Sequence, residues 1–140
     1  DVLRAIRREG SLPVLQAHLQ ALLGDTPMHA TARATFDLAL ANAVALATRA
    51  ADAGADGDVL ARQVASALYH VTSAVAMAWE AGQIGSVRRM RLAQLVLVHR
   101  VLPQDPLGGG VEPEWLAETV EPPADGVVRA AGPVDQINVF

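Results

Sequence analysis

The stretch Gln63–Trp79, QVASALYHVTSAVAMAW, decides the fold of this 140-residue chain, because it contains no Asp, Glu, Lys or Arg. An uncharged run of this length is either a helix inside a protein core or a helix that crosses a membrane. It is slightly short for the hydrocarbon core of a bilayer, and it contains Gln, Tyr, His, Thr and two Ser. We therefore interpret it as the buried central helix of a helical bundle and predict no membrane span.

Two further helices are predicted before this one in the first 24 residues. The first ends at Gly10, and its apolar stripe consists of Val2, Leu3 and Ile6. Ser11 is predicted to cap the second helix, and Gly24 to serve as its C-cap. The predicted buried face of this second helix consists of Leu12, Leu15, Leu19, Leu22 and Leu23.

A third helix is predicted from the start signal of Asp25 or Thr26 followed by Pro27, because proline is tolerated in a first helical turn. It continues through an alanine-rich sequence to Gly54. The many alanines here and in the central helix predict a close approach of the two helix axes.

The sequence GADGD after the third helix predicts a turn, in which Asp56 or Asp58 caps the central helix. This helix is predicted to end near Gly82, and Ser86 to cap a fifth helix that Pro103 stops. The apolar residues assigned to the central helix are Val59, Leu60, Val64, Leu68, Val71, Val75 and Met77. The sequence therefore predicts an all-α, antiparallel helical bundle of about four to five helices over residues 1–106.

The composition changes over residues 107–140, which are predicted to form a Gly/Pro-rich linker and a docking tail. The sequence LGGG predicts a hinge, EPEWLAETV at 112–120 one short helix, and the remainder irregular structure. The apolar residues predicted to dock are Trp115, Leu116, Ile137, Val139 and Phe140.

Overall composition excludes some function classes. The chain has no cysteine, which excludes disulfides, thiolate zinc sites and a cysteine nucleophile and is typical of cytoplasmic proteins. The net charge of −4 and pI near 5.4 argue against nucleic acid as a partner.

No residue pattern predicts catalysis, cofactor binding or a metal site. His70 has no His, Asp or Glu three or four positions away, so we interpret it as a hydrogen-bonded core histidine. Glu80, at the end of the uncharged run, is predicted to reach solvent or an arginine instead of acting as a base. Ser73 lacks the third orienting group that an activated serine requires.

Arg88, Arg89 and Arg91 form the candidate interaction site, together with Trp115 in the tail. The three arginines lie in the first turns of the fifth helix, where the helix dipole disfavours cations by a few tenths of a kcal/mol each. A compensating partner is therefore expected. The candidates are a carboxylate such as Glu80 or Asp105, an anionic ligand, a neighbouring subunit and nucleic acid, and a solvated or ion-paired face is favoured.

Two segments resemble a known family. DVLRAIRREG, residues 1–10, resembles the helix that follows the EGT/SxN loop of the acyl-CoA dehydrogenase superfamily. LYHVTSAVAMAWEAGQIGSVRRMRLAQLVLVHRVLPQDPL, residues 68–107, is similar to the closing helices of members with an additional C-terminal helical region, such as alkylation-response proteins and very-long-chain enzymes.

The resemblance implies a non-catalytic C-terminal helical part of an FAD-dependent oxidoreductase. Its catalytic glutamate and most of its flavin contacts would lie upstream of Asp1, so FAD would be bound by the parent or partner chain. The implied partner is the catalytic domain or a split subunit, within a homo-oligomer of the parent. The implied role is to support that domain, the acyl pocket or the subunit interface.

The alternative is a stand-alone helical protein–protein interaction module that docks through the tail and the Arg88–Arg91 turn. The two hypotheses differ in the apolar surface that they predict. The family hypothesis expects an exposed apolar face that involves Val2, Leu3, Ile6 and the tail, whereas a stand-alone module expects every apolar stripe to be paired internally.

Overall fold

The structure is a computed structural model, and it describes residues 2–102. The predicted docking tail at 107–140, with Trp115, and the predicted stop at Pro103 lie outside the described residues. The described helices are α1 (Val2–Glu9), α2 (Ser11–Gly24), α3 (Ala30–Asp52), the 3₁₀ helix η1 (Gly54–Leu60), α4 (Ala61–Ile84) and α5 (Val87–Arg100). Residues 2–102 contain no strand, and the predicted all-α fold is confirmed.

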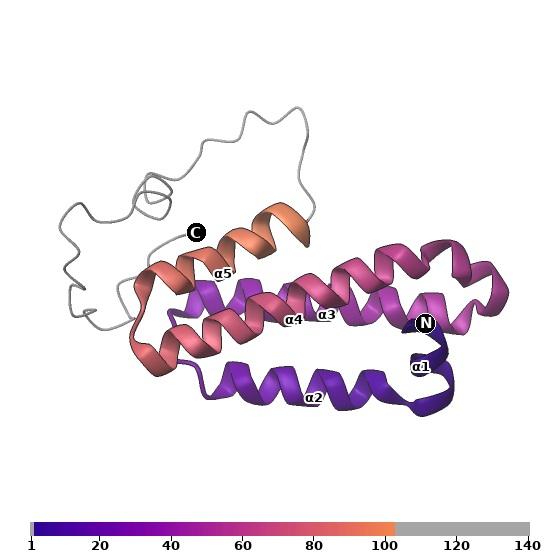
Figure 1. Ribbon diagram of the computed structural model, residues 1–140, viewed down its shortest axis with the longest axis horizontal. Coiled ribbons are helices and arrows are strands. Elements are labelled where there is room, and N and C mark those ends of the chain that lie inside the picture. The colour runs from indigo at the N-terminus through magenta and orange to yellow at the C-terminus, as the bar shows by residue number, and fades with distance from the viewer. Residues whose placement is uncertain (1, 103–140) are drawn as a thin grey trace.

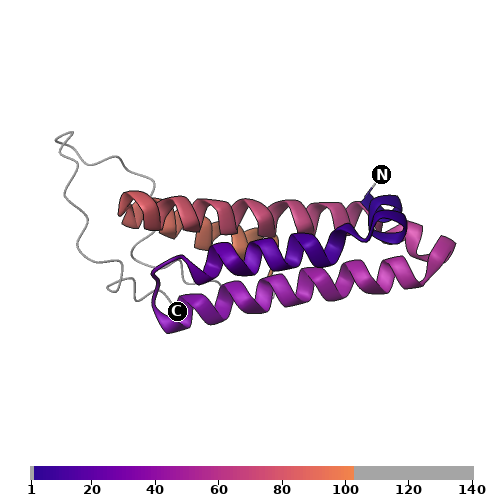
Figure 2. The same cartoon turned by 90° about the horizontal axis from the view of Figure 1, so that it is seen from below.

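Helices α2, α3, α4 and α5 form an antiparallel bundle in which each helix reverses the direction of the one before it (Figure 1). The long α4, which contains the uncharged run, packs against α2, α3 and α5 (Figure 2). The short α1 lies across the end of the bundle, near the corner between α3 and α4 (Figure 1). The central position of α4 explains why its sequence tolerates so few charges.

Small side chains bring α3 and α4 together at the centre of the bundle. Ala39, Ala43 and Ala47 recur every fourth residue of α3 and are almost fully buried, as are Ala74 and Ala78 of α4. Larger side chains from α2, α3, α4 and α5 complete the core. Those of this group that are almost completely buried are Leu19, Leu23, Phe36, Val64, Val71, Val75, Met90 and Leu97.

The predicted ends of α2 and α3 are wrong by a few residues, because local polar groups continue to satisfy the backbone. Gly10, in the left-handed conformation with φ of 60°, occupies the N-cap position of α2, and Ser11 is already helical. Asp25, not Gly24, is the C-cap, and its backbone N–H donates to Ala21 O at 3.1 Å. The Thr26 hydroxyl donates to Leu22 O at 2.7 Å, so Thr26 closes α2 and does not start α3.

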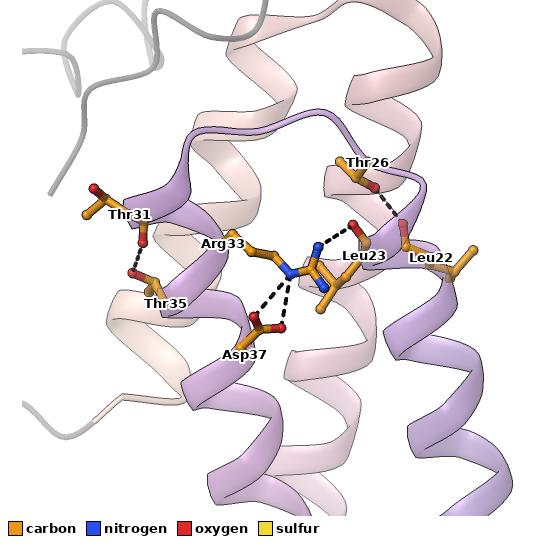
Figure 3. A network of polar contacts seen from close by, with 7 residues as sticks. All are labelled: Leu22, Leu23, Thr26, Thr31, Arg33, Thr35 and Asp37. Atoms are coloured by element: carbon orange, nitrogen blue, oxygen red, sulfur yellow. Dashed lines mark hydrogen bonds and ion pairs between the residues drawn. The ribbon is translucent and has the colours of Figure 1, made fainter.

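The N-cap of α3 is His29, whose Nδ1 accepts from the backbone N–H of Thr31 at 3.3 Å. A network behind this cap joins α3 to α2 (Figure 3). Arg33 Nε donates to both carboxylate oxygens of Asp37 at 3.1 Å, and its Nη1 donates to Leu23 O at 3.0 Å. Arg33 therefore gives Leu23 O, at the end of α2, a second donor beside the backbone N–H of Thr26.

The sequence GADGD is part of a 3₁₀ helix that leads directly into α4, and neither aspartate in it caps α4. Because of this 3₁₀ turn, Val59 is 85% exposed and does not belong to the buried face of α4. Helix α4 continues past Gly82 and ends at Gly85, which has a φ of 65°. The predicted cap of α5 is confirmed, since Ser86 Oγ accepts from the Arg89 N–H at 3.2 Å.

Candidate functional site

Arg7 fixes α1 to the corner between α3 and η1. Its Nη1 pairs with Asp58 Oδ1 at 3.0 Å, and its Nε donates to Ala51 O at 3.2 Å. Its Nη2 donates to Ala50 O at 3.1 Å and also to Gly54 O. Leu3 of the same helix is only 2% exposed. Helix α1 is therefore an integral part of this bundle, held by one buried leucine and one multiply bonded arginine.

With α1 held in this place, an open groove of about 540 Å³ is formed between α1, α2 and α4. We call it the apolar groove, because its lining contains no charged residue. It is lined by Val2, Ala5, Ile6, Ser11, Leu12, Leu15, Ala65, Leu68, Tyr69, Thr72, Ser73 and Ala76. Val2 and Ile6, predicted as part of an exposed apolar face, line this groove and are half-buried, whereas Leu3 points into the core and is buried.

The apolar groove explains why the uncharged face of α4 is wider than the face that packs into the core. One stripe of α4, which includes Val64, Val71 and Val75, is buried in the core. A neighbouring stripe lines the groove at the helical spacing of three and four residues, and it consists of Ala65, Leu68, Tyr69, Thr72, Ser73 and Ala76. The absence of charge in Gln63–Trp79 thus extends beyond the buried face, onto a face that residues 2–102 leave partly exposed.

The chemistry of the groove suits an apolar protein segment. The Ser73 hydroxyl already donates to Tyr69 O at 2.8 Å, so this serine is engaged with its own helix. The Tyr69 side chain is 68% exposed, with its ring at 5.1 Å from that of His70 in an edge-on arrangement. A tyrosine on the rim of an apolar groove is typical of protein interfaces, where the ring packs and the hydroxyl stays wet.

The predicted interaction arginines lie on another part of the surface and do not line the apolar groove. Arg88 and Arg89 are exposed and Arg91 is half-buried. Arg89 forms an ion pair with Glu80, and both side chains are close to half exposed. The sequence predicted that Glu80 would reach solvent or an arginine, and that a carboxylate would offset the unfavourable interaction of the arginines with the helix dipole. The Glu80–Arg89 pair confirms this for one of the three arginines. Trp115 lies outside the described residues.

The histidine prediction is wrong in one respect. His70 is half-buried and its ring lies edge-on to that of Tyr69, because its position on α4 is beside the buried stripe and not within it. Within residues 2–102 no group of three or more His, Cys, Asp or Glu residues could hold a metal ion. Over the same range, no helix is long and apolar enough to cross a membrane.

Sequence reasoning missed the apolar groove, although a signal was present. The uncharged run is wider than a single buried stripe requires, and Ala65, Thr72 and Ala76 continue it onto a second face. Comparison with models of protein families, with curated proteins and with solved structures gave no match.

Proposed function

We propose that this chain is a non-catalytic helical module that docks onto another folded domain through the apolar groove. The observation that carries the proposal is the uncharged, open groove between α1, α2 and α4, one wall of which is a regular stripe of α4. An uncharged helix face is costly to leave in water and is typical of a surface that a partner covers. The groove accepts an apolar helix or loop, since such segments dock by placing side chains at three- and four-residue spacing.

The partner that we propose is the FAD-binding catalytic domain of an acyl-CoA dehydrogenase-like flavoprotein. The support for this identity is the resemblance of residues 1–10 and 68–107 to the C-terminal helices of that superfamily. The half-buried Val2 and Ile6 in the groove lining agree with part of the apolar face that the family hypothesis expects, whereas Leu3, expected on the same face, is buried. On this proposal FAD belongs to the partner domain, the parent is a cytoplasmic homo-oligomer, and the module supports the acyl pocket or the subunit interface.

The test is site-specific photo-crosslinking in cells of the source organism. Tyr69 is replaced by p-benzoylphenylalanine, which keeps an aromatic ring at the exposed rim of the groove. The crosslinked product is identified by mass spectrometry and by its flavin absorbance. We expect the crosslink to join Tyr69 to a flavoprotein domain of this superfamily, either in a second chain or in a longer polypeptide heavier than 14.7 kDa.

A matched pair of variants makes the result specific to the groove. Thr72→Arg places a charge in the lining, whereas Thr48→Arg makes the same change on an exposed part of α3 outside it. We expect Thr72→Arg to abolish the crosslink and Thr48→Arg to leave it unchanged. Equal yields from the two variants would refute docking through the groove.

The second candidate is the stand-alone helical interaction module. The internal docking of α1 favours it, because Leu3 is buried and Arg7 is bonded to α3 and η1 without any other chain. A Thr72-sensitive crosslink to a protein without flavin, from a chain of 14.7 kDa, would support this candidate and refute the flavoprotein partner.

A further inference from the structure

A second groove lies on the other side of α4, between α3, the start of α4 and the end of α5, with a volume of about 860 Å³. We call it the basic groove, because arginines are its only charged residues. It is lined by Asn42, Ala43, Ala45, Leu46, Arg49, Val59, Arg62, Gln63, Ser66, Ala67, Arg100 and Val101. The groove shares no lining residue with the apolar groove, so the two surfaces are independent.

The charges of the basic groove are not neutralised within the described part of the chain. Arg49, Arg62 and Arg100 form no ion pair with any residue of the range 2–102. Three other arginines show the contrast, since Arg7, Arg33 and Arg89 are each paired with a carboxylate. Three like charges beside one groove repel each other, and an acidic occupant would remove that repulsion.

The lining between the arginines is mixed: Asn42, Gln63 and Ser66 are polar, and the remaining residues are alanine, valine or leucine. Val59 is 85% exposed, and Leu46 and Val101 are half-buried beside it. An occupant that fits both features carries acidic and apolar side chains in alternation. A nucleic-acid backbone satisfies the arginines but leaves the aliphatic wall uncovered, so the lining favours a peptide.

The chain itself contains such a segment. Residues 2–102 contain ten Arg and seven Asp or Glu, whereas residues 103–140 contain one Arg and seven Asp or Glu, giving formal net charges of +3 and −6. Within the second range, 111–121 reads VEPEWLAETVE, with four glutamates among Val111, Trp115, Leu116 and Val120. This composition is complementary to the basic groove in both charge and hydrophobicity.

The stretch of chain that joins the end of α5 to the segment 111–121 is also short. Arg100 and Val101 line the groove, so the chain leaves α5 at the edge of the groove itself. The eight residues between Leu102 and the segment 111–121 span at most about 30 Å when extended, which is enough to reach along the groove. A tethered segment also binds at a high effective concentration, so weak individual contacts suffice. We propose that the segment 111–121 binds in the basic groove of its own molecule, with its glutamates paired to Arg49, Arg62 and Arg100.

Trp115 gives a direct readout in the full-length chain, because Trp79→Phe leaves it as the only tryptophan. We measure its emission maximum and its quenching by acrylamide, a neutral quencher, at low and high salt. Docking predicts a blue-shifted, protected Trp115 at low salt that becomes exposed as salt screens the surface pairs. Circular dichroism confirms that each variant retains its helices.

Two sets of variants identify the groove. In one, Arg49→Glu and Arg62→Glu reverse two groove charges, and the control Arg4→Glu with Arg8→Glu reverses two exposed charges of α1 outside it. Because each exposed ion pair contributes a factor of roughly two to five, we expect the ratio of docked to free segment to fall about tenfold in the groove variant. The control should remain close to the parent chain.

The second set leaves residues 2–102 intact and changes Glu112, Glu114, Glu118 and Glu121 to Gln, which should also free Trp115. Combining the groove reversal with Glu→Arg changes in the segment should restore protection. A Trp115 that is fully exposed in the parent chain at low salt would overturn the proposal. So would protection that survives both sets of changes, or protection that depends on protein concentration, which would place the segment on a second copy.

Discussion

Replacing Gly57 by alanine should destabilise the bundle strongly, because η1 passes very close to α3 at this position. A Cβ on Gly57 would lie 1.9 Å from Ala50 O and 2.8 Å from Ala50 C, both of which are backbone atoms. Real Cβ atoms essentially never lie closer than 3.0 Å to another heavy atom. To bring the new Cβ to that distance from Ala50 O, η1 must move by about 1 Å. Ala50 O also accepts Arg7 Nη2 at 3.1 Å, so this movement disturbs the corner that holds α1.

The size of the loss in the free energy of unfolding depends on whether the new Cβ meets side-chain or backbone atoms. Overpacking against side chains costs about 1–3 kcal/mol, and a clash with a helix backbone that cannot rotate away belongs at the upper end. A loss of about 3 kcal/mol corresponds to a fall in Tm of about 12–24 °C for a domain of this size. The assay is thermal and urea unfolding of the full chain, followed by circular dichroism.

Two other glycines supply a graded control for the same chemical change. Nothing lies within 4 Å of a Cβ on Gly24, so Gly24→Ala should stabilise the chain by about 0.5–1 kcal/mol through the lower entropy of the unfolded state. A Cβ on Gly82 would meet Pro27 Cδ at 2.9 Å, and that ring can shift, so Gly82→Ala should fall between the two. If Gly57→Ala unfolds at the same temperature as Gly24→Ala, the close approach of η1 to α3 is refuted.

Three further substitutions test other parts of the bundle. Gln94 is 0% exposed, and its Oε1 and Nε2 have no hydrogen-bond partner within residues 2–102, so Gln94→Met should stabilise the chain by about 1–3 kcal/mol in urea unfolding. Destabilisation would show that the amide has a partner such as a bound water. Arg7→Met removes the contacts that hold α1 and should lower hydrogen-exchange protection of the α1 amides far more than that of α4, whereas uniform loss would contradict this local role. The Glu80–Arg89 pair is close to half exposed, so a double-mutant cycle with Glu80→Gln and Arg89→Met should give a coupling below about 1 kcal/mol, and a larger value would contradict solvent screening.

The parts of the fold that were predictable from sequence are those set by periodicity. The uncharged run, the leucine stripe of residues 12–23 and the Ser86 cap each depend on residues close together in the chain. The helix over the uncharged run and the Ser86 cap are confirmed, whereas the leucine stripe is confirmed in part, since Leu12, Leu19 and Leu23 are buried but Leu15 and Leu22 are half-buried. The predicted helix ends were wrong where the expected capping side chain has a different partner. Thr26 was expected to start α3 but bonds back to Leu22, and Asp58 was expected to cap α4 but pairs with Arg7, which is 51 positions away.

The grooves could not be predicted from the sequence for a related reason. Each groove combines residues from three helices, and no local pattern says that Ile6 will face Thr72, or that Arg49 and Arg100 will border the same hollow. What the sequence did contain was the excess width of the uncharged run. Such excess is informative because a buried stripe needs only part of a helix circumference.

The bonds of Arg7 also have a consequence for the order in which the chain folds. Its partners lie 43 to 51 positions away, at the end of α3 and in η1, so that corner must exist before α1 can be held. An eight-residue helix is unstable alone, and α1 is therefore expected to become structured last. Since α1 forms one wall of the apolar groove, the docking surface is complete only in a fully folded molecule. A partner that binds there thereby distinguishes finished bundles from partly folded ones.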